Sequence, residues 1–491
     1  MTAQTILPAN SVTGGYEVSN SLRFNSGSSD TLSINMGTSS SRRIWTLSTW
    51  IKLSRDTNAD NMNIVGTGAS DDQNHIGFDG SGSVGNTKIA LRHHNGTSSD
   101  IHIQSNANYN DQSAWYHVVY SVDTTQGTDT NRVKIYVNGT QVTSLATSTY
   151  PSQNYDWDFF QNGSTTYIGR RGHSSAYLLD GYLAETVWID GTQLTPTSFG
   201  EFDEDSGIWK PISVSGLTFG DAGFYLETKQ SGTSQNSSGL GADTSGNDNH
   251  FAVNNLTAVD QSIDTCTNNF ATLNPLQPTT YDASNAMTLR EGNLQLHGST
   301  DGGPKFAGAS TIGVSSGKWY AEFKSTISNN VFGMVGVDSN PGELARNDKY
   351  PGFYANSYGY FKDGEKYTGN SGSSYGNAWT NNTIGIALDL DNNKLYFSKD
   401  GTFQNSGDPT SGATGTGAIA ITAASSTTAG AYFFVLGDTS TSYINPFDCN
   451  FGSPMHSISS GNADGNGLGN FEYAVPSGYF ALCTKNLAEH G

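Results

Sequence analysis

The fold is decided by IWTLSTWIKL at residues 44–53, a stretch in which apolar and polar side chains alternate. Trp45 and Ile51 fall on one face of an extended chain, and Lys52 falls on the other. Successive side chains of a β-strand point to opposite sides, so this period of two predicts a strand with one buried face. Trp50 is the exception, because it places a large ring on the otherwise polar face.

Further strand patterns follow this stretch along the chain. The dipeptide Asn138-Gly139 separates two of them, and both residues tolerate the positive φ angles of a type I′ turn, which predicts a tight hairpin. No amphipathic helix of useful length competes with the strands. The patterns are AWYHVVYSVD (114–123), RVKIYVNGTQV (132–142), TYIGRR (166–171) and YLAETVWIDG (182–191).

A second group of strand patterns occupies the C-terminal half. In TIGIALDLDNNKLYFSKDG (383–401), two alternating runs flank a turn at Asp391-Asn-Asn393, which predicts an antiparallel pair. The chain is also rich in glycine, with 58 residues, and only 14% of its residues are charged. Many short strands joined by Gly, Asn and Ser turns fit this composition, so we expect an all-β protein.

The N-terminal patterns resemble the LamG-like, concanavalin-A-type jelly roll. Six pieces match in the order of the family and cover nearly all of residues 21–191. Where the family often has Asp-Glu in its last strand, this chain has Ala184-Glu185, which argues against a family-type cation site there. The pieces are SLRFNSGSSDTLSI, IWTLSTWIKL, AWYHVVYSVD, VKIYVNGTQV, TYIGRR and LDGYLAETVWIDG.

The C-terminal patterns resemble a SPRY domain, which is also a β-sandwich. ALDLDNNKLYFSKDG is the most distinctive piece, and AYFFVLGD and CNFG match the closing strands of the family. The resemblances predict two antiparallel β-sandwiches joined by a Gly/Ser/Asn-rich region. The expected divisions are an N-terminal docking segment (1–20), a LamG-like jelly roll (21–200), a connecting region (201–286), a SPRY-like sandwich (287–455) and a C-terminal tail (456–491).

Part of the connecting region is expected to belong to the first sandwich. The stretch DTSGNDNH (243–250) is similar to a segment that precedes the first strand in jelly rolls of this family, although here it follows the domain. We therefore expect residues 217–256 to fold back and complete the first sandwich, as in a circular permutation.

Both modules together, with the pieces GFYLE, SGNDN and GYFALCTKNL, resemble structural proteins of tailed phages from marine bacteria. This resemblance implies a virion protein assembled in the host cytoplasm, such as a tail fibre or fibre tip. It would recognise a host-surface glycan or receptor, contact other virion proteins and form a homo-oligomer. The alternatives are a structural or decorating particle protein and, as a minor option, a glycan hydrolase of jelly-roll fold.

Charge and hydropathy exclude several partners. The formal net charge is −20, and no basic stripe is present, so we expect neither nucleic-acid binding nor attraction to an anionic membrane. No segment reaches the roughly 18 apolar residues of a membrane span, and the N-terminus lacks the pattern of a secretory signal. The three cysteines are far apart and have no metal-ligand spacing, so reduced thiols are expected.

No motif supports catalysis, and we expect a protein that is not an enzyme and requires no cofactor. Glu201, Asp203 and Asp205 approach the paired-carboxylate spacing of glycan hydrolases, but they lie in an acidic run that reads as a solvated turn. The stretch RHHNGTSSDIHI (92–103) offers His93, His94, Asp100 and His102 to a metal, yet cross-strand polar pairs of a hairpin explain it better.

Two aromatic-rich loops are the candidate ligand sites, because flat rings cover the apolar faces of sugars. They are YPSQNYDWDFFQNG (150–163) and KYPGFYANSYGYFKDGEKY (349–367). The alternative is that these rings cap the sandwiches or pack between domains. The candidate ligand-binding residues are Tyr155, Trp157, Phe159, Phe160, Tyr354, Tyr358 and Tyr360.

Oxygen-rich loops are the candidate calcium sites. Asp30 lies in one such loop, and Asp243, Asn247 and Asn249 lie in another. Carboxylate and amide oxygens suit a hard cation such as calcium. The same residue types also form turns without metal, because their side chains accept hydrogen bonds from nearby backbone amides.

Overall fold

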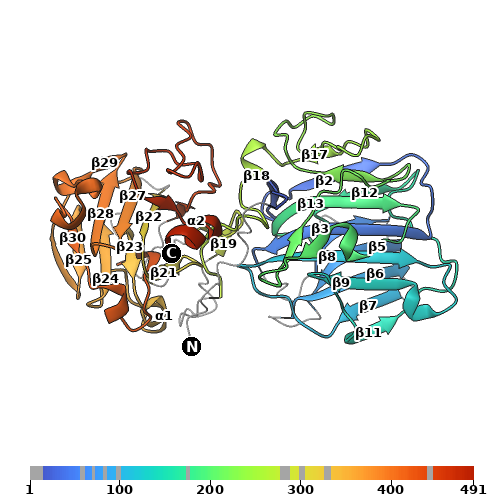
Figure 1. The fold of residues 1–491 in the computed structure, drawn as a ribbon, viewed down its shortest axis with the longest axis horizontal. Helices are drawn as coiled ribbons and strands as arrows, with labels where there is room; N and C mark the ends of the chain where they lie inside the picture. Colours follow the sequence, from blue (N-terminus) through green and yellow to red (C-terminus); the bar gives the residue numbers. More distant parts are fainter. Residues whose placement is uncertain are drawn as a thin grey trace. The chain divides into compact units, whose positions relative to one another are not determined.

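The computed structural model describes residues 15–491 except 56–60, 69–71, 81–85, 96–100, 173–176, 277–287, 298–304, 326–332 and 440–445. The described residues form two compact units, residues 15–267 and residues 268–491, which we call the N-terminal and C-terminal units. Each unit consists almost entirely of antiparallel strands (Figure 1), which confirms the predicted all-β class and its β-sandwiches. Among the described residues, no helix is long and apolar enough to cross a membrane.

The N-terminal unit contains two eight-stranded sheets. Sheet A has the order β10-β9-β8-β3-β13-β1-β18, with β16 paired to β13, and sheet B has the order β11-β7-β6-β5-β4-β12-β2-β17. The strands of sheet A are β1 (Ser21–Phe24), β3 (Ile44–Leu53), β8 (Trp115–Asp123), β9 (Val133–Val137), β10 (Thr140–Gln141), β13 (Gly181–Asp190), β16 (Phe224–Leu226) and β18 (Gln261–Ser262). The strands of sheet B are β2 (Thr31–Asn35), β4 (Met62–Thr67), β5 (Asp72–Asp79), β6 (Lys88–Asn95), β7 (Ile101–Ser105), β11 (Leu145–Thr149), β12 (Thr165–Ile168) and β17 (Ala252–Asn254).

One apolar core lies between these two sheets. Trp45 and Ile51 of β3 contribute to it from sheet A, and Ile76 and Leu91 contribute from sheet B. The alternation in residues 44–53 therefore identified the core-facing side of β3. The Asn138-Gly139 hairpin is confirmed as well, because φ is 46° and 77° at these residues and Val137 pairs with Thr140.

The outer face of sheet A is covered by the chain itself. A hairpin of β14 (Gly200–Phe202) and β15 (Trp209–Pro211) brings Trp209 into a buried cluster with Trp50 and Trp115. Lys52 is also buried there, and its Nζ lies 2.7 Å from Oδ2 of Asp264. The covering explains Trp50, since this face of β3 is a second apolar layer and not a solvated surface.

Residues 217–256 supply a strand to each layer of the N-terminal sandwich. Their β16 pairs with β13 in sheet A, and their β17 pairs with β2 in sheet B. The chain then adds β18 beside β1, and the backbone amide of Val18 donates to Thr267 Oγ1 at 3.1 Å. Residues 201–267 are thus part of this unit, whereas residues 1–14 of the expected docking segment lie outside the described residues.

The C-terminal unit also contains two sheets. Sheet C has the order β19-β20-β32-β22-β27-β28-β29, with β30 paired to β28 and β33 to β22, and sheet D has the order β21-β31-β23-β24-β25-β26. The strands of sheet C are β19 (Thr288–Arg290), β20 (Gln295–His297), β22 (Lys318–Ser325), β27 (Thr383–Asp389), β28 (Lys394–Lys399), β29 (Thr402–Phe403), β30 (Ile419–Ala420), β32 (Phe447–Asn450) and β33 (Phe480–Ala481). The strands of sheet D are β21 (Phe306–Ala309), β23 (Gly333–Asp338), β24 (Ser357–Phe361), β25 (Glu365–Thr368), β26 (Ser371–Ser374) and β31 (Phe433–Asp438).

The tail at residues 456–491 packs against sheet C. Its β33 runs parallel to β22, and the backbone amides of Glu472 and Tyr473 donate to the carboxylate of Glu322, each at 2.9 Å. Short helices, α1 (Pro341–Arg346) and α2 (Thr484–His490), accompany the strands of this unit. Cys266, Cys449 and Cys483 are buried free thiols, as the sequence predicted.

Candidate functional site

The aromatic loop at residues 150–163 is part of the core of the N-terminal unit. Trp157, Phe159 and Phe160 are at most 3% exposed, and Trp157 packs edge-to-face on Trp45. Tyr155 is half-buried, and its hydroxyl lies 2.6 Å from Nδ1 of His93. The prediction of a sugar platform is therefore wrong for the three buried rings, because their faces are already in contact with other side chains.

The second aromatic loop divides between the inside and the outside of the C-terminal unit. Tyr358 and Tyr360 of β24 are core residues, with 5% and 0% exposure, and Tyr360 Oη donates to the Asn377 carbonyl at 2.6 Å. They are not available to a ligand, which corrects the prediction for both. Tyr354 is half-exposed and lies beside Phe353.

Half-exposed rings gather on this unit near sheet D. Tyr350 contacts Phe353 and Tyr367, and Phe361 contacts Tyr367, with ring centroids 5.5–6.1 Å apart. Alternation along β24 explains the arrangement, because Tyr358 and Tyr360 point inward while Phe361 points outward. We call this group the aromatic surface; its members are Tyr350, Phe353, Tyr354, Phe361 and Tyr367.

The predicted calcium loop at Asp243 is closed by hydrogen bonds. The Asp243 carboxylate accepts from the backbone amides of Tyr225, Ser245 and Asn249 at 2.8–2.9 Å. The side-chain amide of Asn247 donates to the carbonyls of Gly220 and Gly223, and that of Asn249 donates to the carbonyls of Asp221 and Gly223. These bonds join the loop to the turn before β16.

Asp30 has a comparable place in its own turn. It is 2% exposed, and its Oδ2 accepts from the backbone amide of Asn25 at 3.0 Å. Among the described residues, no three His, Cys, Asp or Glu side chains converge as metal ligands. Calcium at Asp30 or at the Asp243 loop stays a prediction.

The acidic run at residues 201–205 spans the end of β14 and the turn of the β14–β15 hairpin: Glu201 pairs with Lys210 in the strands, and Asp203 and Asp205 lie in the turn that the sequence indicated. Asp203 accepts hydrogen bonds from the amide and hydroxyl of Ser206 and from Lys210 Nζ, and these lower its pKa to about 2. A carboxylate held ionised in an exposed turn is not poised to donate a proton to a leaving group.

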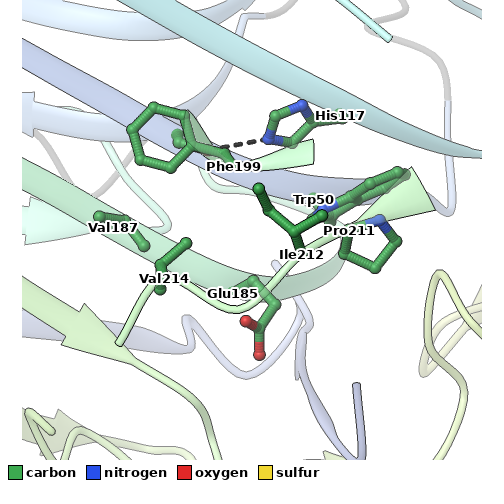
Figure 2. A pocket seen from close by; sticks show the side chains of 9 residues that line it. Trp50, His117, Glu185, Val187, Phe199, Pro211, Ile212 and Val214 are labelled. Atoms are coloured by element: carbon green, nitrogen blue, oxygen red, sulfur yellow. Dashed lines mark hydrogen bonds between the residues drawn. The ribbon is translucent and has the colours of Figure 1, made fainter. Parts of the chain in front are cut away.

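A small buried hollow lies beneath that hairpin, on the outer face of sheet A (Figure 2). Its volume is about 10 Å³, which is close to the least that one water molecule requires. Ser48, His117 and Glu185 supply its polar groups, and Figure 2 shows the Glu185 carboxylate pointing away from His117.

Ser48 and His117 are close enough to suggest a nucleophile and its base. Ser48 Oγ lies 2.8 Å from His117 Nε2, and Trp209 Nε1 donates to His117 Nδ1 at 2.9 Å. An indole nitrogen can only donate, so Nδ1 must be the acceptor and the imidazole proton lies on Nε2. Ser48 then accepts from His117, which is the reverse of the direction that activates a serine. Burial also lowers the pKa of His117 to about 3.

Sheet B places a row of polar side chains on the outer face of the sandwich. His75 of β5 pairs with Arg92 of β6, and Arg92 pairs with His102 of β7. Residues paired directly across antiparallel strands point to the same face. Their neighbours Ile76 and Leu91 point into the core, so the row points away from it. We call His75, Arg92 and His102 the polar row.

Small residues lie beside the polar row where the chain packs closely, since a Cβ atom on Gly77 would lie 2.2 Å from the Met62 carbonyl oxygen. Gly77 pairs with Ala90, and neither carries a long side chain. Asp79 and His102 meet across them, with Asp79 Oδ2 3.2 Å from His102 Nε2. Arg92 and His102 are partly exposed, whereas His75 is 3% exposed.

Sequence reasoning missed this face, although the signal was present. In KIALRHHN, Lys88, Ala90 and Arg92 alternate with core residues, and the pairing of Arg92 with His102 confirms the predicted cross-strand polar pairs. What the sequence could not supply is the register that brings His75 into the row, because that depends on a pairing between separate strands.

A comparison with known protein families supports the predicted jelly roll in the N-terminal half of the chain. Residues 26–197 match the family model described as the Concanavalin A-like lectin/glucanases superfamily, so this part of the chain contains a lectin/glucanase-type domain. The match spans β2 to β13 and includes the polar row. No curated protein matches the chain.

Solved structures similar to parts of the chain include a SPRY domain and a pentraxin. The SPRY domain of human HERC1 is 16% identical, with 36% of this chain and 96% of that chain covered and a TM-score of 0.27. The native heptameric SAP-like pentraxin from Limulus polyphemus is 18% identical, with 37% and 80% covered and a TM-score of 0.25. Stonustoxin is 16% identical, with 37% and 27% covered and a TM-score of 0.26.

Proposed function

We propose that the chain is a non-catalytic virion protein of a phage, a tail fibre or fibre tip that binds a glycan or receptor on the host surface. The observation that carries the binding role is the polar row, which lies on the face of the N-terminal sandwich that points away from the core. The other outer face, that of sheet A, is covered by residues 192–219 together with Val18 and Cys266, and its apolar side chains are buried.

The lectin/glucanase match fits this proposal without deciding between binding and hydrolysis. Two features favour binding. The hydrogen-bond direction between Ser48 and His117 does not activate the serine. The acidic turn at Asp203 holds an ionised carboxylate in a solvated hairpin. The phage setting rests on the sequence resemblance alone.

Binding of the fluorescently labelled full chain to candidate host cells, with and without EDTA, tests the proposal. Saturable binding is expected for a receptor-binding protein. Loss of binding in EDTA would support calcium at Asp30 or at the Asp243 loop, whereas its persistence would remove calcium from the mechanism. Absence of saturable binding on a permissive host would contradict the proposal, as would release of reducing sugar from a bound glycan.

The aromatic surface of the C-terminal unit favours a second candidate, a structural protein that docks on other particle proteins. Its half-exposed rings, which include the contacting pair Tyr350 and Phe353, suit a protein interface, since aromatic residues are enriched at such interfaces. In that case Phe353→Ser should reduce incorporation into particles and leave host-cell binding of the free protein unchanged. Normal incorporation of the variant would contradict the docking role.

A further inference from the structure

A tight crossing of the chain over sheet B brings a second arginine to the polar row. Gly66 of β4 pairs with His75, so it occupies the next position along the row. A Cβ atom on Gly66 would lie 2.5 Å from the Arg170 carbonyl oxygen and 2.8 Å from the Arg171 Cα. The backbone of residues 170–172 therefore passes directly over Gly66 and sets Arg171 beside His75.

Two cationic side chains thus act on one buried neutral imidazole. Burial lowers the pKa of His75 to about 3, and repulsion from Arg171 and Arg92 adds to the effect. Burial also lowers the pKa of Arg171, and Arg92 contributes to that lowering. Like charges placed together in a low-dielectric site destabilise the free protein, and such arrangements are typical of sites that bind an opposite charge.

Nδ1 of His75 and Nε of Arg171 are buried here and have no hydrogen-bond partner among the described residues. Polar groups removed from water normally find a partner, so each of these atoms has an unused capacity to bond. The Arg171 guanidinium is oriented by Tyr177, whose ring centroid lies 4.8 Å from Cζ.

We propose that Arg92 and Arg171, with His75 between them, bind a carboxylate or sulfate group of an acidic polysaccharide. This inference rests on the proposed glycan-binding function and names its ligand class. Guanidinium groups bind such anions through paired N–H donors, and the anion would relieve the repulsion between the two arginines. Asp79 also faces this cluster, and its Oδ2 lies 3.2 Å from Nε2 of His102.

The test measures binding of the full chain to dextran sulfate, polygalacturonate and unmodified dextran. The wild type should bind at least one of the acidic polymers and should bind dextran at least tenfold more weakly. The double variant R92Q/R171Q should bind the acidic polymers at least tenfold more weakly than the wild type. Arg290→Gln, which removes one exposed charge from the C-terminal unit, should stay within twofold.

Stability separates a binding role from a structural one. If the arginines bind an anion, R92Q/R171Q should melt no lower than the wild type, because two repelling charges are removed. Arg171→Lys keeps the charge and loses the planar guanidinium, so this variant should fold and bind the acidic polymers with intermediate affinity. If the double variant does not fold, the affinity of Arg171→Lys tests the binding role instead. Equal binding by the wild type and either variant would overturn the proposal.

Inorganic sulfate distinguishes failure of this site from failure of the proposed function. At matched ionic strength, sulfate should raise the melting temperature of the wild type more than that of R92Q/R171Q. If no polysaccharide binds but this difference holds, the anion site stands and the glycan-binding function fails. If a neutral glycan binds both proteins equally and sulfate acts equally on both, the function stands and the anion site is wrong.

Discussion

Glu185 shows how one residue can be held in an unfavourable state by its surroundings. Its φ is 51°, a left-handed conformation that costs free energy in a residue with a side chain, and it lies at the β-bulge where β13 shifts register against β3. The hydroxyls of Tyr16 and Tyr225 both donate to its Oε2. These bonds do not fully replace water, and burial raises the pKa of Glu185 to about 7.

The stability of the protein should therefore depend on this carboxyl between pH 5 and pH 8. A pKa raised in the folded state means that the folded protein holds the proton more tightly, so the contribution is complete below pH 4.5 and is lost as pH rises through 7. A rise from 4.5 to about 7 corresponds to about 3 kcal/mol. Glu185→Gln should remove this part of the pH dependence in urea denaturation.

The comparison with the variant isolates Glu185 from other titrating groups. Asp338 of the C-terminal unit, whose pKa burial raises to about 6, titrates in the same range in both proteins and cancels in the difference. Parallel curves of unfolding free energy against pH for the wild type and Glu185→Gln would show that the carboxyl is solvated after all.

At the scale of elements, the sequence predicted the strands well because a strand's period is local. The runs at residues 44–53, 114–123 and 383–401 became β3, β8 and the β27–β28 pair with boundaries within one or two residues. Alternation distinguishes the two faces of a strand, but it does not say whether the second face meets water or another layer. That is why Trp50 was an exception in the sequence, and why the sequence could not distinguish the buried rings of the aromatic loops, such as Trp157 and Tyr360, from the half-exposed ones, such as Tyr354.

The β9–β10 hairpin allows a test of the prediction that its turn requires glycine at position 139. Gly139 has a φ of 77°, and a Cβ atom there would lie 2.4 Å from the ring of Trp209. Gly139→Ala should therefore destabilise the protein by about 2 kcal/mol, from the left-handed backbone and the displaced ring together. Gly127→Ala is the matched control, because no atom lies within 4 Å of its Cβ position. Equal denaturation midpoints for the two variants would contradict the role of Gly139.

At the scale of the whole molecule, the N-terminal sandwich is complete only when sequence-distant segments join it. Val18 and Cys266 lie on the outer side of sheet A, where they share a buried cluster with Trp50 and Trp115, and β18 extends the same sheet beside β1. The LamG-like pattern ends near residue 191. Up to that residue the chain has not yet covered the apolar outer face of sheet A. The folding unit is therefore longer than the pattern that reveals it.

A fragment of residues 12–267 should fold cooperatively, whereas a fragment of residues 21–200 should not. The shorter fragment lacks β16, β17 and β18 and would expose the apolar outer face of sheet A to water. Thermal unfolding, solubility and binding of a hydrophobic dye distinguish the two. A soluble shorter fragment with a sharp melting transition would mean that the sandwich folds without the later segments.

The net charge of the protein should slow its association with an acidic polymer, because the two carry charge of the same sign and repel each other. The chain carries 24 basic and 44 acidic residues, so its formal charge of −20 repels a sulfated or carboxylated polysaccharide at long range. Salt screens that repulsion over a Debye length of about 10 Å at 0.1 M but weakens the partly buried contacts at Arg92 and Arg171 less. The association rate should therefore rise between about 10 mM and 150 mM salt, whereas a ligand held by a broad basic surface would associate more slowly. Stopped-flow association at several salt concentrations measures this, and a rate that falls throughout the range would place the anion on a different, more exposed surface.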